Sequence, residues 1–305
     1  MRRRHKLRVA GINPSRFDKT QIKFYLYLIP ITCVMGLPII FIFFNAFKPL
    51  DELLNYPPSF ITLRPTLQNF RNLMATSANK SIPMSRYLFN SISSTLLVVL
   101  FTLLITVMAA YCMSKKRYKL KNFLFSVNEA ALMFVSVAVA IPRYMIINEV
   151  GFIDSFWSHV IPLLAMPVGL YLVKQFIDDL PDSMIEAAKI DGAGDFYILR
   201  KIIIPNISPA LATVAILAFQ ASWNSMEASN YYINNEALKS FSFYMTTLTA
   251  SSGNANALVG QLSGNAIAGL GMQAAATLIM FLPNLILFVI LQSRVMNTMS
   301  HSGMK

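Results

Sequence analysis

The sequence predicts an all-α integral membrane protein with six membrane-spanning helices and a charged cytosolic helix-turn-helix between spans 4 and 5. Composition is the first of three observations behind this prediction: 55% of the 305 residues are hydrophobic and 13% are charged, with a mean hydropathy of +0.52. Such a chain has too few charges to cover a water-soluble globule of this length. The second observation is a series of long apolar runs, and the third is an uneven distribution of Lys and Arg.

Six apolar runs are long enough to cross a bilayer, which takes roughly 20 predominantly apolar residues in a helix. Charged residues separate these runs, which extend over residues 24–47, 87–113, 123–142, 156–173, 207–224 and 271–291. Glu129 interrupts the third run, and Pro162 and Pro167 occur in the fourth. The transmembrane domain is therefore expected to cover residues 24–292.

The positions of Lys and Arg predict the orientation, because cytosolic segments of membrane proteins carry an excess of these residues. If the N-terminus is cytosolic, the inside segments contain 19 of the 26 Lys and Arg residues and the outside loops contain 7. Both ends are therefore predicted to be cytosolic, as a basic tail of residues 1–23 and a tail of residues 293–305. Residues 48–86 then form a long extracellular loop, and residues 181–205 form a cytosolic loop.

The net charge of +12 raises the alternative of a nucleic-acid-binding protein with a basic N-terminal arm. The basic residues, however, lie at the ends of the apolar runs on one side and lack interleaved stacking aromatics. Charges that set the topology and contact anionic lipid account for this pattern. We therefore expect membrane lipid, and no nucleic acid, as a partner.

Motifs for self-contained chemistry are missing from the sequence. It contains no G-x-x-x-x-G-K-[ST] and no H-E-x-x-H, and its three histidines are His5, His159 and His301. We therefore expect no catalytic, cofactor or metal site on this chain. If ATP powers the protein, it is hydrolysed on another polypeptide.

The cytosolic loop of residues 181–205 is predicted to begin with a short helix. Pro181 suits a helix start, and Ser183 with Glu186 has the spacing of a capping box, in which each side chain bonds to a backbone N–H near the helix end. The first helix is therefore expected over residues 182–191.

A tight corner and a second helix are predicted to follow. Gly192 lies where the chain needs a left-handed conformation, which glycine adopts without a Cβ penalty. Asp195 is then expected to cap a second helix over residues 196–204, which Pro205 interrupts. A compact, rigid pair of helices of this kind is able to transmit a push.

This loop resembles the cytosolic signature of the permease subunits of bacterial ABC importers, which reads E-A-A, three residues, G, nine residues, I, one residue, L-P. Here Glu186-Ala187-Ala188 is followed at those intervals by Gly192, Ile202 and Ile204-Pro205, with Ile204 in place of the usual Leu. The extended form Asp191-Gly192-Ala193 is similar to the branch that imports carbohydrates, of which the maltose-type inner-membrane components are the best known.

The resemblance extends over most of the chain. Similar motifs occur at residues 44–49 (Phe-Asn-Ala-Phe-Lys-Pro), at Asn90-Ser91, at residues 151–154 (Gly-Phe-Ile-Asp) and at Trp223-Asn224. One departure follows the last of these: family members often continue with an acidic residue and Phe, whereas Ser225 and Met226 stand here.

The resemblance implies a permease subunit without its own ATPase site, in a bacterial cell membrane. It implies a second homologous permease, a dimer of cytosolic ABC ATPase subunits that use ATP, and an extracellular solute-binding protein that delivers a carbohydrate, such as an oligosaccharide. The residues implied in ATPase coupling are Glu186, Ala187, Ala188, Asp191, Gly192, Ala193, Ile202 and Pro205. Two alternatives stay open: an ABC permease for a non-carbohydrate solute, and an ATP-independent channel or secondary transporter.

Polar residues inside the predicted spans are further candidates. Glu129 is expected to face the bundle or to pair with a basic residue, because an unpaired charge in the membrane is costly. Gln220, Trp223 and Asn224 lie at the outer end of the fifth span, where amides and an indole face suit sugar hydroxyls. They are candidates for the translocation pathway, with an interfacial anchor as the alternative for Trp223.

Overall fold

The computed structural model describes residues 22–53, 55, 57, 59–78, 82–259 and 265–302. Over these residues the chain consists of helices and their connections, and no strand occurs in this part. The predicted N-terminal tail lies outside the described residues except for its last two. The predicted C-terminal tail is helical as far as residue 302, because the last helix continues into it.

Among the described residues, three helices are long and apolar enough to cross a membrane unbroken. They are α1 (Ile22–Phe47), α4 (Met84–Lys115) and the apolar part, Gly269–Ser293, of α15 (Asn265–Ser302). These helices contain the first, second and sixth predicted spans.

The fourth predicted span is bent. It consists of η2 (Phe156–His159), α7 (Ile161–Leu164) and α8 (Pro167–Asp178), with an angle of 42° between the parts before and after the break. Pro162 and Pro167 each lie in the first turn of a helix, where the missing N–H has no helical partner to lose. A proline therefore lies in the first turn of both α7 and α8.

The fifth predicted span corresponds to α12 (Ser208–Trp223), which meets the preceding helical segment at an angle of 81°. If each of the two bent pairs counts as one span, the described residues provide up to five helices that could cross a membrane, by length and composition. The described part of the chain is thus all-helical with membrane-spanning helices, while the total of six spans remains a prediction.

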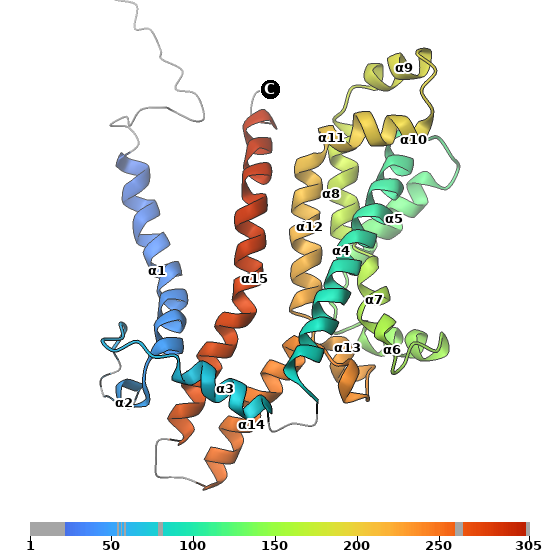
Figure 1. The fold of residues 1–305 in the computed structure, drawn as a ribbon. Helices are drawn as coiled ribbons and strands as arrows, with labels where there is room; N and C mark the ends of the chain where they lie inside the picture. The colour runs from blue at the N-terminus through green and yellow to red at the C-terminus, as the bar shows by residue number, and fades with distance from the viewer. Residues whose placement is uncertain are drawn as a thin grey trace, which may run out of the picture.

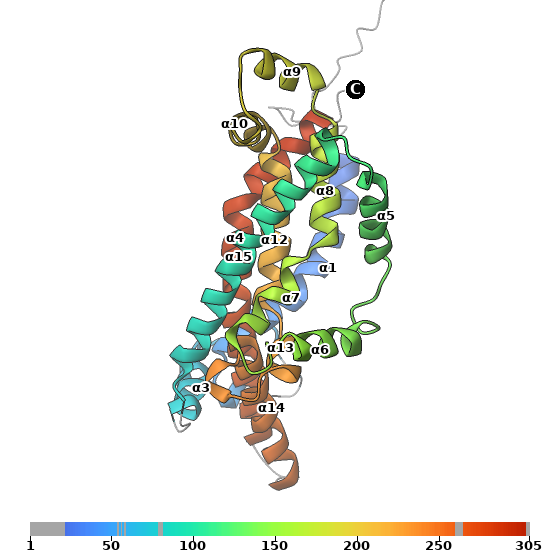
Figure 2. The same cartoon turned by 90° about the vertical axis from the view of Figure 1, so that its right-hand side faces the viewer.

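The third predicted span does not form one continuous helix. α5 (Lys121–Leu132) ends before a stretch of turns, and α6 (Ala140–Glu149) begins only at residue 140. Pro142 lies in the first turn of α6, where its missing N–H has no helical partner to lose. In Figure 2, α5 runs along the bundle and α6 lies across its lower part.

The bundle is built around α4, which packs against α8 and α12, while α15 packs against α12 and α1. One end carries α9 (Asp182–Ile190), α10 (Asp195–Ile198) and α11 (Ile204–Asn206), together with the N-terminal end of α1 and the C-terminal end of α15 (Figure 1). The other end carries the remaining short helices and α14. These short helices are α2 (Leu50–Leu53), α3 (Gln68–Ala78), α6, α13 (Glu227–Tyr231) and η4 (Glu236–Leu238).

The sequence reading missed α14 (Phe241–Val259), which packs antiparallel against α15 at this second end (Figure 1). Its first residues join a buried cluster in which the rings of Tyr87 and Tyr244 stack with centroids 4.3 Å apart. A second buried cluster lies at the opposite end, between α4, α8, α12 and the segment from α9 to α11. This second cluster supports the candidate coupling site.

Candidate coupling site

The first helix of the predicted helix-turn-helix is α9, close to the expected bounds, but the predicted capping box is wrong. Pro181 occupies the N-cap position, no side chain caps the helix end, and Ser183 and Glu186 are exposed. Asp182 in the first turn pairs with Lys115 instead, and an acidic side chain at this position also suits the helix dipole.

The corner after α9 is a Schellman motif built on Gly192. Gly192 has φ +80, its N–H donates to the carbonyl of Lys189 at 3.0 Å, and the N–H of Ala193 donates to the carbonyl of Ala188 at 2.9 Å. This pair of hydrogen bonds defines the motif and needs a left-handed residue, preferably glycine, at its centre. The predicted glycine corner is therefore confirmed, and the motif accounts for the interval between Ala188 and Gly192.

The second helix is less regular than predicted. It consists of α10, a π-helical turn over Leu199–Ile203, and α11, and its N-cap is Gly194 rather than Asp195. Pro205 has no N–H for the carbonyl of Lys201, and the wider π turn in front of it closes through Ile204, whose N–H donates to the carbonyl of Leu199. Residues 182–206, from α9 to α11, are called the coupling element below.

Two neighbouring lysines at the end of α4 hold both helices of the coupling element. Lys115 Nζ lies 2.7 Å from Asp182 Oδ1, and Lys116 Nζ lies 2.6 Å from Asp195 Oδ2. Asp195 also accepts a hydrogen bond of 3.1 Å from the hydroxyl of Tyr111. These lysines, acting first through their hydrogen bonds, hold the pKa of both carboxyl groups below the usual range.

Apolar side chains fix the inner face of the coupling element to the bundle. Ile185, Ile198 and Ile203 are buried, together with Val173 and Ile177 of α8. Burying side chains of this size contributes about 1.5 to 3 kcal/mol each. Burial and the ion pairs together attach the coupling element to α4 and α8 as one body.

The outer face of the coupling element is exposed and partly apolar. Ile190 is 86% exposed and Phe196 is 75% exposed, although both are large hydrophobic residues. Glu186 is also exposed and makes no hydrogen bond or ion pair with any residue that the structure describes. A protruding surface that combines exposed apolar groups and an unpaired carboxylate suits contact with another protein.

Five of the predicted coupling residues line one hollow of about 590 Å³ on the coupling element. Its lining residues are Ala188, Asp191, Gly192, Ala193, Gly194, Tyr197, Lys201 and Ile202. Glu186 and Ala187 lie on the exposed surface of α9, and Pro205 lies apart on α11. The sequence reading missed Tyr197 and Lys201, and it treated Lys115 and Lys116 only as topological charges.

The three predicted pathway residues lie at the end of α12, and they differ in how far they are buried. Gln220 and Asn224 are exposed, whereas Trp223 is buried and donates from Nε1 to the carbonyl of Met280 on α15 at 3.0 Å. Asn284 of α15 donates to Asn224 Oδ1 at 3.3 Å. Trp223 therefore connects α12 to α15 within the helix bundle. It does not lie at the surface of the bundle, as an interfacial anchor would.

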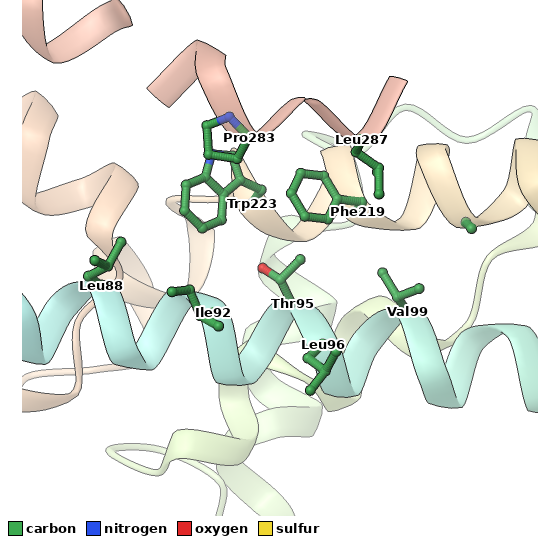
Figure 3. A pocket seen from close by; sticks show the side chains of 10 residues that line it. Leu88, Ile92, Thr95, Leu96, Val99, Phe219, Trp223, Pro283 and Leu287 are labelled. Carbon is green, nitrogen blue, oxygen red and sulfur yellow. The ribbon is translucent and has the colours of Figure 1, made fainter. Parts of the chain in front are cut away.

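Trp223 also lines an apolar cavity of about 430 Å³ between α4, α12 and α15 (Figure 3). Its ring stacks on Phe219 with centroids 5.9 Å apart. The only polar lining side chain besides the indole is Thr95, whose hydroxyl accepts a hydrogen bond from Ser222. The cavity thus offers a sugar one polar lining group with remaining hydrogen-bonding capacity, the Thr95 hydroxyl, within an otherwise apolar wall.

Glu129 is exposed on α5 and has no ion pair with a residue in the described part of the chain, so the expected pairing is not formed within it.

A charged pair that the sequence reading missed lies at the second end of the bundle. Arg143 Nη1 donates to both carboxylate oxygens of Glu227 at 2.8 and 2.9 Å, and the hydroxyl of Tyr232 donates to Glu227 Oε1 at 2.7 Å. This pair borders a hollow of about 620 Å³.

The motif at residues 151–154 fixes the segment after α12. Gly151 has φ +78 and ends α6 in a second Schellman motif, and Asp154 has φ 60. Asp154 Oδ1 accepts hydrogen bonds from the N–H groups of Asn234 and Asn235 at 2.9 and 2.7 Å. Asn90, from another motif, donates to the carbonyl of Ala237 at 2.8 Å. These motifs thus hold one loop at the second end of the bundle.

The fold and this site define a helical membrane domain with an exposed helix-turn-helix at one end. Residues 102–294 match the family model of the binding-protein-dependent transport system inner membrane component. Because the match covers more than half of the chain, the protein belongs to this family.

Two relatives are similar over much of their length. The sulfoquinovosyl glycerol transport system permease protein SmoH of Agrobacterium fabrum is 28% identical, over 90% of this chain and 91% of that protein. The trehalose transport system permease protein SugB of Mycobacterium tuberculosis is 28% identical, over 64% and 70%. A chain in the crystal structure of a bacterial ABC transporter for import of the acidic polysaccharide alginate has the same fold, with a TM-score of 0.71 and 20% identity over 91% and 98%.

Proposed function

We propose that the chain is the permease subunit of an ATP-driven ABC importer and forms half of a membrane channel for a carbohydrate, such as an oligosaccharide. The observation that carries the proposal is the coupling element: a rigid helix pair that protrudes from the bundle, is tied to α4, and presents the unpaired Glu186. Membership of a family of binding-protein-dependent inner membrane components supports the same conclusion.

The coupling element faces the cytosol in this proposal. It lies at the same end of the bundle as the N-terminal end of α1 and the C-terminal end of α15 (Figure 1). The excess of Lys and Arg in the segments at this end favours the cytosolic side. Both termini are then cytosolic.

A dimer of cytosolic ATPase subunits binds the coupling element and that of a second, homologous permease. When the ATPase dimer closes on ATP, the coupling elements move together, and α4 and α8 follow because the coupling element is packed against both. ATP hydrolysis resets the helices. The coupling residues are Glu186, Ala187, Ala188, Asp191, Gly192, Ala193, Ile202 and Pro205.

An extracellular binding protein delivers the solute at the opposite end, where the loop held by Asp154 and Asn90 lies. Carbohydrate is the favoured solute because SmoH and SugB are named for sugar-containing solutes. At the end of α12, Gln220 and Asn224 present exposed amides that suit sugar hydroxyls. The buried Trp223 supports this part of the pathway from within.

Ligand-stimulated ATP hydrolysis tests the proposal. The chain would be purified with its partner permease, ATPase and binding protein. ATP hydrolysis would then be measured with mono- and oligosaccharides, amino acids, peptides and polyol phosphates. We expect stimulation by a carbohydrate only. Stimulation by another class would indicate an ABC permease for a non-carbohydrate solute, and uptake without ATP would indicate a channel or secondary transporter.

A further inference from the structure

An apolar groove of about 460 Å³ lies between α4, the coupling element and α12, and a single charged residue lies in its wall. Nine of its ten lining residues are apolar, and the tenth is Arg200. The lining residues are Leu100, Leu103, Leu104, Val107, Met108, Phe196, Leu199, Arg200, Ile204 and Leu211. This set is called the Arg200 groove below.

The walls of the groove remain open to the surroundings of the chain. Leu100, Leu104 and Met108 are 58%, 52% and 53% exposed, and they follow one another along one face of α4. Arg200 is also exposed, and it makes no ion pair or hydrogen bond with any residue that the structure describes. The groove thus presents an apolar channel and an unpaired guanidinium together.

The dimensions match one leaflet of a bilayer. From Leu100 to Met108 the helix rises by about 12 Å, at about 1.5 Å per residue. One leaflet contributes about 15 Å of hydrocarbon, half of the full core. The last lining residue of α4 is Met108, seven residues before the charged end of the helix at Lys115. Arg200 belongs to the segment that Asp195 ties to this end through Lys116, so Arg200 lies near headgroup depth if α4 spans the membrane.

We propose that the Arg200 groove binds an anionic phospholipid from the leaflet on the side of the coupling element. One acyl chain lies along Leu100, Leu104 and Met108, and the phosphate pairs with Arg200. The unpaired guanidinium and the near absence of other polar groups fit an amphiphile, whereas a sugar would find one polar partner only. The assignment of the leaflet to the cytosolic side rests on the proposed function.

Quenching of an introduced tryptophan by brominated lipids tests this proposal on the intact transporter complex in nanodiscs. Leu104→Trp places the probe in the groove, and Met108→Trp is a second probe if the first variant does not assemble. The nanodiscs contain phosphatidylcholine with either brominated phosphatidylglycerol or brominated phosphatidylcholine. The same complex with the unaltered chain, which contains Trp157 and Trp223, is measured in parallel, and its fluorescence is subtracted.

We expect phosphatidylglycerol to bind at this probe about 5-fold more tightly than phosphatidylcholine, the effect of one basic side chain near a headgroup. Arg200→Gln should abolish the preference, whereas Lys201→Gln should retain it, because Lys201 lines the other hollow of the coupling element. A probe at Leu96, which lines the cavity without charged residues, should show no preference.

Equal quenching by both lipids at Leu104→Trp would overturn the proposal, as would a preference that survives Arg200→Gln. Absence of quenching, with Leu96→Trp still quenched, would also overturn it, because another protein chain would then cover the groove. ATP-driven uptake by the same complex is measured separately in proteoliposomes. A negative result for the lipid site can therefore be told apart from a negative result for the proposed transport function.

Discussion

Lys115 connects α4 to the coupling element through Asp182, with 2.7 Å between Lys115 Nζ and Asp182 Oδ1. The same ammonium group donates to the carbonyl of Leu180 at 2.9 Å, and only 10% of the lysine side chain is exposed. Lys116 repeats the arrangement with Asp195 on the second helix. A displacement of the coupling element is therefore transmitted to α4 as well as to α12.

Replacement of Gly192 by valine should uncouple ATP hydrolysis from transport. A residue with a Cβ in the left-handed conformation costs about 1 to 2 kcal/mol, and a β-branched residue fits it poorly. No atom lies within 4 Å of a Cβ at Gly192, so the effect comes from the backbone alone. We expect Gly192→Val to insert in the membrane but to lose substrate-stimulated ATP hydrolysis.

Gly194→Val is the matched control for this prediction. Gly194 also has open space around its Cβ position, but its φ is −73, which any residue adopts. This variant should keep substrate-stimulated hydrolysis. Equal stimulation in both variants would show that the left-handed corner has no role in coupling.

Glu186→Lys should weaken the attachment of the ATPase. In the proposed complex, Glu186 faces a basic residue of the ATPase. Removing one member of a buried ion pair costs about 3 to 5 kcal/mol, which corresponds to a loss of affinity of more than about 100-fold. Because Glu186 has no partner among the described residues, we expect the isolated chain to keep its stability. Copurification of the ATPase and thermal unfolding measure the two effects.

Asp179→Lys makes the same charge change on an exposed residue at the C-cap of α8, outside the coupling element. It should leave ATPase attachment unchanged. The account of Glu186 fails if the two variants lose the ATPase to the same extent.

The ion pair between Asp195 and Lys116 should remain formed in mild acid. Lys116 lowers the pKa of Asp195 in the folded chain. The ion pair therefore makes its full contribution to the stability of the folded chain above the unfolded-state pKa of about 3.9. This contribution is lost only as the pH falls through the lower folded-state pKa. A spin label at Ser183→Cys, with Cys33 and Cys112 replaced by serine, should keep the same mobility from pH 8 to pH 5.

Asp195→Asn should mobilise the same spin label throughout this pH range, because the ion pair is then absent. The exchange Lys116→Asp with Asp195→Lys should immobilise it again. Mobility that rises between pH 8 and pH 5 in the chain with Asp195 would contradict the assignment of the ion pair.

Gly271→Ala should destabilise the packing of α15 against α3 and, through Asn69, the attachment of α3 to the end of α1. A Cβ at Gly271 would lie 2.5 Å from Asn69 Oδ1. Asn69 donates to the carbonyls of Ala46 and Lys48 at 3.1 and 2.9 Å, and displacing it leaves these acceptors without their partner. We expect a loss of about 1 to 3 kcal/mol, seen as a lower midpoint of thermal unfolding.

Gly36→Ala is the control, since no atom lies within 4 Å of a Cβ at that position in α1. This variant should unfold at the original midpoint or above. An unchanged midpoint for Gly271→Ala would mean that Asn69 moves aside at no cost.

The sequence predicts α1, α4 and α15 well because each contains one long apolar run. It fails at residues 123–142, where hydropathy alone does not reveal the break between α5 and α6, although Pro142 is its local signal. It also misses α14, whose run of Ser, Thr and Asn residues lacks the apolar length of a span.

In the candidate site, the corner at Gly192 is predictable because its cause is local: glycine is favoured at that backbone conformation. The ion pairs between the coupling element and α4 are not predictable from the sequence. Lys115 and Asp182, for example, are 67 residues apart and meet only through the packing of α8 against α4. The predicted cap by Asp195 fails for a related reason, whereas the predicted cap by Ser183 fails because Ser183 lies inside α9. Asp182 and Asp195 bind the lysines of α4, and Pro181 and Gly194 are the N-caps.

Solute accumulation in proteoliposomes tests the central claim most directly. The complete complex would be reconstituted with the binding protein and labelled carbohydrate on one side and ATP on the side of the coupling element. We predict concentrative uptake that requires ATP and is lost in Glu186→Lys and Gly192→Val. Uptake that proceeds equally without ATP, or that is unaffected by both substitutions, would contradict the account.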